Sequence, residues 1–551
     1  MRVPRTSFAI FNSILALTFT LALVHAHAAY AADIYVAQSA LGSGNGIDCA
    51  DAKAASWFNS SSSWGTNAGQ IGPGTTVHLC GTFTDRTPGD TLLNVLGSGT
   101  SSSPITIKFE SGATLTNTAY WGLNGAIYLN GNSWVTVDGG GTGIIQNTGN
   151  GTGLAYAQPS TAIFLGNTQN VTIKNLVISN ICQHTSISDS NACNSGGAND
   201  KAVKIQNGAI KLLIQGNTIH DSQNCIELYG SNSDTVTING NTIYRCNWGI
   251  GGYGASTSVV ITNNDIYGVI GGPNNWATTN DQFHHNGIFF FPQSANMNGM
   301  VIADNFIHDI GGTTGSSGTE TGHIYIEPGS GADVPNALIY NNVLTTSAGA
   351  YPPANAYITD REGASGTKIF NNTIVESSGA ATHWNSCIMA QNSPTIENNV
   401  CEGMQVGIWL SNNPTSVVSN YNDFYGLLGN GTGAFITGDG ATGYPTLSAW
   451  TSSTGYDASS IATDPSLTSA FMLNSGSPVI GKGTNLTSTG ISGLTASAPQ
   501  IFGINYSCGT ACLTRPSSGA WDMGAYEFSG SGSTQKPAAP TGLTGQPTQI
   551  P

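Results

Sequence analysis

One carboxylate stands in an unusual setting, in the segment HIYIEPG at residues 323–329. Apolar and other side chains alternate there with a period of two, which is typical of a half-buried strand. Ile324 and Ile326 are therefore expected to face a core, and Tyr325 and Glu327 to face outward. Charged residues make up only 8% of the chain, so an outward acid beside an aromatic ring favours a chemical role.

Further acidic residues lie in the segment TDREG, which contains Asp360, Arg361 and Glu362. If this segment forms the next strand, its backbone lies about 5 Å from that of Glu327. Paired carboxylates at such separations act as acid, base or nucleophile on a glycosidic bond, and aromatic surroundings would raise the pKa of one of them, as a general acid requires. We expect Glu327 to pair with Asp360 or Glu362. The alternatives are a sugar hydrogen bond or a surface position for Glu327, and a turn contact with Arg361 for Asp360.

A second group of chemically capable residues is Asp281, His284 and His285, in the segment NDQFHHNG. Adjacent imidazoles beside a carboxylate can deliver a proton near neutral pH or bind a metal ion. Neighbouring His side chains point in different directions in most backbones, so a structural role is the alternative. We expect no cofactor, because the chain has no paired CxxC motifs and no EF-hand or nonapeptide calcium repeat. Asp- and Asn-rich bends could still bind Ca²⁺.

A recurring phrase indicates which elements position these residues. Segments such as VTINGNTI at 236 and VVITNNDI at 259 repeat a short apolar strand with an Asn, and the shortest intervals are 23 and 24 residues. One turn of a solenoid has this length, and it buries its apolar face only by stacking on its neighbours. A bend repeated at about 4.8 Å lets amide side chains pair along a ladder. The expected ladder comprises Asn175, Asn217, Asn241, Asn264, Asn305, Asn342, Asn372 and Asn399.

A second strand family accompanies the phrase, from AIYLNG at 126 to GIWLSN at 407. Alternation places one apolar column inside and two columns outside. Stacked rings can stabilise one another beneath a covering loop, or they can bind sugar rings through the CH faces of the sugars. Two long ladder intervals, 41 residues from Asn264 to Asn305 and 37 from Asn305 to Asn342, fall just before residues of this aromatic row, and long loops on a rigid scaffold favour a site. The candidate binding residues are Tyr229, Tyr253, Phe289, Phe291, Tyr325, Tyr357, Arg361 and Trp409.

The Asn phrases over about residues 120–425 resemble the right-handed parallel β-helix superfamily, the pectate-lyase-like fold of secreted polysaccharide lyases, polygalacturonase-type hydrolases, esterases and epimerases. The segment that begins DPSLTSAF and ends DMGAYEF resembles the closing part of many bacterial exported β-helix proteins. The resemblance implies an all-β, right-handed parallel β-helix solenoid with capping segments. It does not choose among the chemistries of that fold. The clustered aspartates of the polygalacturonase type are not evident.

Five zones are expected along the chain. Arg2 and Arg5, the apolar run at 8–24 and the small-residue site at 29–31 indicate an export signal, with a membrane anchor as the alternative. Solenoid ends need caps, and a Gly/Ser- and Pro-rich tail lacks a core. We therefore expect a signal peptide at 1–31, an N-terminal cap at 32–120, the β-helix body at 121–428, a segment covering the last turn at 429–528, and a linker or tail at 529–551.

The charge and the cysteine content of the chain limit its possible binding partners and its cellular compartment. The chain has 15 basic and 30 acidic residues, so a nucleic-acid partner is not expected. No segment after the signal is long and apolar enough to span a bilayer. We expect a secreted or surface-associated monomer. The ten cysteines suit an oxidising destination, and near neighbours suggest the pairs Cys49/Cys80, Cys182/Cys193, Cys225/Cys246, Cys387/Cys401 and Cys508/Cys512.

The sequence as a whole predicts an exported polysaccharide-active enzyme that cleaves glycosidic bonds with carboxylates in an aromatic-lined groove. One alternative is a lyase that acts by β-elimination on a uronate-containing glycan. It would use a base such as Arg361 or Lys204, although Lys204 is most simply an ion-pair partner of Glu227. Another alternative is a non-catalytic glycan-binding or adhesive surface protein.

Overall fold

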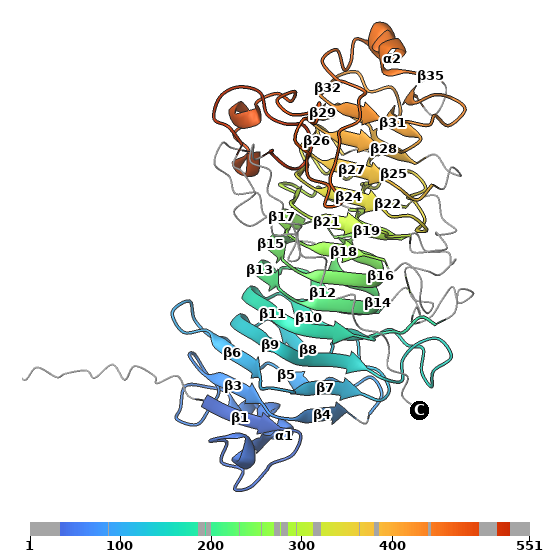
Figure 1. Ribbon diagram of the computed structural model, residues 1–551. Helices are drawn as coiled ribbons and strands as arrows, with labels where there is room; N and C mark the ends of the chain where they lie inside the picture. The colour runs from blue at the N-terminus through green and yellow to red at the C-terminus, as the bar shows by residue number, and fades with distance from the viewer. Residues whose placement is uncertain are drawn as a thin grey trace, which may run out of the picture.

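The chain folds into a right-handed parallel β-helix, in which each turn stacks on the one before it (Figure 1). Every full turn contributes a strand to each of three parallel rows, and neighbouring strands within a row pair in register. The computed structural model describes residues 33–85, 87–185, 193, 200–230, 232–254, 256–268, 276, 285–293, 295–311, 321–362, 364–379, 385–438, 442–494 and 515–528.

Row one carries the second strand family. It comprises β5 (Leu93–Asn94), β8 (Ile127–Asn130), β10 (Thr161–Gly166), β12 (Lys201–Gln206), the second part of β14 (Thr218–Tyr229), the second part of β16 (Thr242–Gly252), β19 (Asn286–Phe290), β22 (Gly322–Ile326), β25 (Ala356–Asp360), β28 (Ser386–Ala390), β31 (Val406–Leu410) and β34 (Phe435–Thr437).

Rows two and three flank the bend that carries the ladder asparagines. Row two comprises β1 (Asp33–Ala37), β3 (Thr76–Leu79), β6 (Ile105–Phe109), the first parts of β9 (Ser133–Asn147) and β11 (Gln169–Ser179), β13 (Ile210–Gln215), β15 (Ser233–Asn239), β17 (Ser256–Thr262), β20 (Val301–Ala303), β23 (Leu338–Tyr340), β26 (Lys368–Phe370), β29 (Thr395–Glu397) and β32 (Val418–Asn420). Row three comprises β4 (Thr82–Asp85), β7 (Thr114–Asn117), the remaining parts of β9, β11, β14 and β16, then β18 (Asp265–Tyr267), β21 (Phe306–His308), β24 (Val343–Thr346), β27 (Thr373–Glu376), β30 (Val400–Glu402) and β33 (Asp423–Tyr425).

The core is the inside of the coil, and it is built from columns of identical apolar residues. In row one, successive strands place isoleucines directly opposite one another, and all of them are fully buried. Such a column buries its apolar surface only when several turns are stacked. The repeat length therefore determines the fold, because it brings equivalent isoleucines of successive turns opposite one another. The column comprises Ile226, Ile250, Ile288, Ile324, Ile358, Ile388 and Ile408.

A buried asparagine ladder fixes the bend between rows two and three. Each side-chain amide donates to the Oδ1 atom of the next asparagine at 2.9–3.0 Å, from Asn217 to Asn422. Seven of the eight predicted members are confirmed. Asn175 is not a member of the ladder, and Asn422, at the other end, is a member that the prediction lacked. Asn175 is exposed and has a φ of 56°. It therefore occupies the left-handed position that Gly216 holds in the next turn, one residue before the ladder.

The two ends of the coil are covered by short elements. At the start, β2 (Lys53–Ala54) and α1 (Ala55–Phe58) pack near β1, and Phe58 contacts Trp64 in the core. At the far end, β35 (Thr442–Tyr444) pairs antiparallel with β34. The helix α2 (Leu447–Thr454) follows, and its Trp450 stacks on Phe435 at 5.5 Å. The last turn is thereby shielded from water.

Residues 515–528, which we call the C-terminal segment, lie along the side of the coil on rows two and three (Figure 1). Trp521 packs in one apolar cluster with Tyr340 and Phe370. Arg515 is only 2% exposed, pairs with Glu527 at 3.0 Å and donates to Asn341 Oδ1 at 3.2 Å. The segment therefore joins the end of the described chain to turns far earlier in the sequence.

Four disulfides connect neighbouring parts of the chain, and they confirm four of the expected pairs. These are Cys49–Cys80, Cys182–Cys193, Cys225–Cys246 and Cys387–Cys401. The fifth expected pair, Cys508 and Cys512, lies outside the described residues. Within the described ranges, no helix has the length and apolarity that a membrane crossing requires.

Candidate active site

Strand pairing brings Glu327, Arg361 and Glu362 together on the outer face of row one. Ile326 lies opposite Asp360 in the β22–β25 pair, so the residue after each strand, Glu327 and Arg361, also meets its neighbour. The Arg361 Nε atom lies 3.4 Å from Glu327 Oε1, and its Nη2 atom lies 3.2 Å from Glu362 Oε1. We call these three residues the Glu–Arg–Glu cluster.

The three members of the cluster differ in exposure. Glu327 is only 7% exposed, Arg361 is half-buried and Glu362 is exposed. Burial opposes the charge of Arg361, but the Tyr325 hydroxyl and the two carboxylates outweigh it and raise the pKa of Arg361. A permanently charged guanidinium beside Glu327 stabilises a negative carboxylate there. This suits a nucleophile or base better than a general acid.

Polar side chains on neighbouring strands hold the cluster in place. The Tyr325 hydroxyl accepts hydrogen bonds from Arg361 Nη1 at 3.1 Å and from Asn355 Nδ2 at 3.4 Å. The backbone amide of Glu362 donates to Gln391 Oε1 at 3.0 Å, and Gln391 Nε2 donates to Ser411 Oγ at 3.1 Å. These contacts extend over β25, β28 and β31, so the guanidinium is oriented by groups on rigid strands. The sequence did not predict the hydrogen bond from Asn355 to Tyr325, because Asn355 lies just before β25 and outside the alternating pattern of the strand.

The aromatic row is present, but part of it is covered. Trp248, Phe289 and Tyr325 form a buried cluster on the outer face, with ring centroids 4.5 and 5.7 Å apart. The predicted exposure of Phe289 and Tyr325 is therefore wrong, and mutual packing beneath covering chain is the better description of these rings. The residues that do present ring surface to solvent are Tyr229, which is 45% exposed, and the partly exposed Tyr253, Phe291 and Trp409.

Two further predicted site residues point into the coil, and both assignments are corrected. Asp360 shares an inward column with Ile326 and Ala390, is fully buried, and burial raises its pKa well above the usual value. Tyr357 is also fully buried, and its hydroxyl donates to the Glu376 carboxylate and shares a hydrogen bond of 2.8 Å with the Thr346 hydroxyl. Neither residue can contact a ligand on the outer face.

The strand β25 also differs from the sequence alignment in its register. In the structure Ile358 lies opposite Ile324, whereas the sequence alignment places Ala356 there. A shift of two residues keeps the alternation of inward and outward side chains, so the apolar pattern alone cannot detect it. The shift moves Arg361, in place of Thr359, next to Glu327.

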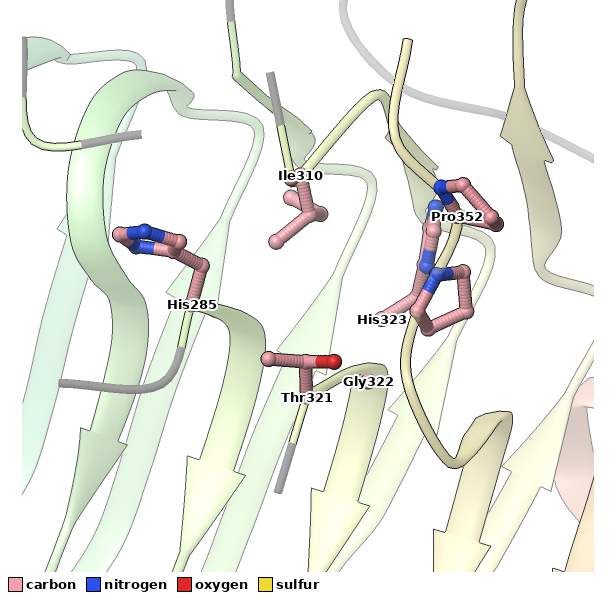
Figure 2. A pocket seen from close by; sticks show the side chains of 8 residues that line it. His285, Ile310, Thr321, Gly322, His323 and Pro352 are labelled. Atoms are coloured by element: carbon pink, nitrogen blue, oxygen red, sulfur yellow. The ribbon is translucent and has the colours of Figure 1, made fainter. Parts of the chain in front are cut away.

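The histidine group does not join the Glu–Arg–Glu cluster. Asp281 and His284 lie outside the described residues. His285 is buried and lines a pocket of about 10 Å³ with Thr321 and His323 (Figure 2). It precedes β19 while Glu327 follows β22, so a strand length of roughly 16 Å separates them. Burial lowers the pKa of His323 to about 4, and its Nε2 atom donates to the Thr345 carbonyl.

A second charged group lies toward the N-terminal end of the same face. Lys201 Nζ lies 3.0 Å from Glu227 Oε2, and both side chains are buried. The predicted pair between Lys204 and Glu227 is therefore wrong. Lys204 instead lies over the rings of Phe164 and Tyr229, 5.5 Å from each centroid. Burial, and then the charge of Lys204, lowers the pKa of Lys201 to about 7.

Oxygen and nitrogen ligands are not gathered into a metal centre anywhere in the described part of the chain. No group of three or more His, Cys, Asp or Glu side chains there could hold an ion. The side chains that the described face offers for acid–base or nucleophilic chemistry are Glu327, Glu362 and Lys201.

Comparison with known proteins yields likeness of fold only. No protein-family model matches the chain, and no curated protein matches it. Among solved structures, pectate lyase Pel9A is 15% identical, with 91% of this chain and 97% of that chain covered and a TM-score of 0.43. The GH136 lacto-N-biosidase from Eubacterium ramulus is 12% identical, with 75% and 67% covered and a TM-score of 0.39. DFA-IIIase from Arthrobacter chlorophenolicus A6 is 12% identical, with 76% and 90% covered and a TM-score of 0.34. The assignment of a parallel β-helix rests on the strand register described above.

Proposed function

We propose that the protein is an exported enzyme that binds a polysaccharide along the outer face of row one and hydrolyses a glycosidic bond at Glu327. The observation that carries this proposal is the Glu–Arg–Glu cluster, in which one guanidinium bridges two carboxylates on a face with partly exposed aromatic rings. Four disulfides support an oxidising destination.

We assign the two carboxylates different roles. The Arg361 guanidinium lies 3.4 Å from Glu327 Oε1 and favours a negative carboxylate there, so Glu327 would attack the anomeric carbon or take a proton from the attacking water. Glu362 is the exposed second carboxylate of the cluster, and we assign to it the transfer of a proton to the leaving oxygen. Phe291 lies one strand before Glu327 and would pack against a neighbouring sugar ring.

The test is a glycan panel read in two ways. Wild-type protein is incubated with soluble polysaccharides, and new reducing ends and the ultraviolet absorbance of unsaturated uronates are recorded in parallel. The proposal expects reducing ends without unsaturated products. Glu327→Gln should lower the rate by about two or more orders of magnitude while binding persists. The matched control is Glu397→Gln, on row two, which should leave the rate unchanged. A Glu327→Gln protein that cleaves at the wild-type rate would refute the proposal.

One observation favours β-elimination as a second candidate. Burial lowers the pKa of Lys201, which favours a neutral amine. Such an amine can take the C5 proton of a uronate as the C4–O bond breaks. This candidate predicts unsaturated uronates, their loss in Lys201→Met, and full activity in Glu327→Gln. Binding without either product would point to a glycan-binding protein.

A further inference from the structure

Lys204, on the outer face of row one, has no acidic partner among the residues that the structure describes. Its ammonium lies between the rings of Phe164 and Tyr229, 5.5 Å from each centroid. It forms no ion pair with any of the described carboxylates. The nearest acids are engaged elsewhere. Glu227 pairs with Lys201, and Asp200 Oδ2 accepts hydrogen bonds from Ser222 Oγ at 2.6 Å and from the Gln223 amide at 2.9 Å.

This arrangement stands out in a chain with a net charge of −15. The other two cations on this face, Lys201 and Arg361, are paired with carboxylates. Burial lowers the pKa of Lys204, which means that its charged form lacks full solvation. An anionic ligand group would supply the missing interaction. Tyr229 lies beside it with 45% of its surface exposed, so ring surface and positive charge occur together.

The charge balance is reversed at the Glu–Arg–Glu cluster. There, two carboxylates face one guanidinium. The turns from Lys204 to Glu327 pass through β12, β14, β16, β19 and β22, which is four strand spacings or about 19 Å. The face therefore has an excess of positive charge at one place and of negative charge at another, several sugar rings apart.

We propose that Lys204 and Tyr229 form a subsite for one acidic sugar of a heteropolysaccharide in which anionic groups alternate with runs of neutral sugars. This proposal rests on the proposed function, because it places neutral sugars at Glu327. Tyr229 packs against the CH face of the acidic sugar and Lys204 pairs with its anionic group. A continuous polyuronate is disfavoured, because it would set a carboxylate against Glu327 and Glu362.

The experiment measures binding by the full chain, with the Lys204→Met variant as the perturbation. The probes are a heteropolysaccharide with one glucuronate per repeat, its carboxyl-reduced derivative, a sulfated glycan with its desulfated form, and polygalacturonate. Wild-type protein should bind the acidic member of one pair roughly tenfold or more tightly than its neutral counterpart. The pair that shows the difference identifies the anion as a carboxylate or a sulfate.

Three variants separate a ligand role for Lys204 from a structural one. Lys204→Met should abolish the preference for the acidic glycan and leave binding of the neutral derivative unchanged, whereas Lys204→Arg should retain the preference. The control is Lys211→Met, an exposed lysine on row two, which should behave like wild type. Circular dichroism checks that each variant is folded.

Two outcomes would overturn the inference. One is that wild type and Lys204→Met bind acidic and neutral glycans alike. The other is that polygalacturonate binds as tightly as the heteropolysaccharide, which would remove the argument for spaced charges. If no glycan is cleaved but the Lys204-dependent preference is observed, the hydrolase proposal fails while the subsite stands, so the two failures are distinguishable.

Discussion

Replacing Asn305 by alanine should remove one rung of the buried ladder at the centre of the coil. The Asn305 side chain donates to Ile261 O, Ala303 O and Asn342 Oδ1, and it accepts from the backbone and side-chain nitrogens of Asn264, all at 3.0 Å. Alanine removes these five hydrogen bonds, although Asn342 Oδ1 still accepts from the backbone amide of residue 305 and Asn264 Nδ2 still donates to Ile238 O and Thr262 O. At about 1 kcal/mol for each neutral hydrogen bond, and with some relaxation, we expect a loss of about 3–5 kcal/mol.

The assay has to resolve a local effect, because long solenoids do not always unfold in one step. Urea unfolding followed by circular dichroism gives the overall loss, and amide hydrogen exchange in β17, β20 and β23 locates it. The matched control is Asn239→Ala, on row two. Asn239 Oδ1 accepts from Thr262 Oγ1 and Asn263 Nδ2 at a partly exposed position, so its donors can turn to water at a cost of about 0.5 kcal/mol.

The ladder argument would be refuted by an Asn305→Ala protein within 1 kcal/mol of the control. It would also fail if the loss of exchange protection were spread evenly over the coil, since the unsatisfied groups lie only on the turns adjacent to residue 305. A loss confined to those turns would show that the stacked amides, and not the apolar columns alone, hold the bend.

Three more predictions concern Tyr325, Asp304 and one disulfide. Tyr325→Phe keeps the buried ring but removes the hydroxyl that orients Arg361, so steady-state kinetics should show kcat falling about tenfold with thermal stability little changed. Burial raises the pKa of Asp304 to about 7, so the neutral form is favoured in the folded state, and its contribution to stability, complete below about pH 4, is lost as the pH rises through 7. Asp304→Asn should therefore be more stable than wild type by about 4 kcal/mol at pH 8 and similar at pH 4, in thermal unfolding across pH. Removing the Cys225–Cys246 disulfide, whose cysteines are 21 residues apart, with serine at both positions should cost about 3 kcal/mol in urea unfolding.

The sequence was sufficient for the fold because the relevant signals are local and repeated. Each apolar strand and each asparagine recurs at nearly one period, so stacking them in register is the only way to bury them together. The single error in the ladder, at Asn175, has a local cause. Asparagine suits both the ladder position and the left-handed position just before it, and residue type alone does not tell the two apart.

The candidate site was less predictable because it depends on how turns of unequal length align. Alternation placed Glu327 outward, as the structure shows, but the loop before β25 hides a two-residue difference in register, and this difference decides that Arg361 and not Thr359 lies beside Glu327. Whether Phe289 and Tyr325 are exposed depends on chain packed over them, which the pattern within a strand cannot report. The strand pattern also does not show which of two nearby lysines a carboxylate contacts. Lys204 lies opposite Glu227 in the strand pair, but Lys201 forms the ion pair.

The position of the C-terminal segment has a consequence for the order in which the protein matures during synthesis. Turns of the coil can stack as soon as they are made, because each contacts only its neighbours. The apolar surface around Tyr340 and Phe370, however, is covered by Trp521, and Arg515 bonds Asn341 across 174 residues. Leu486, Ile491 and Leu494 cover part of that surface. The part under Trp521 stays open until residues 515–528 have been made, and a premature stop before residue 515 leaves it as an exposed apolar patch on the side of the coil.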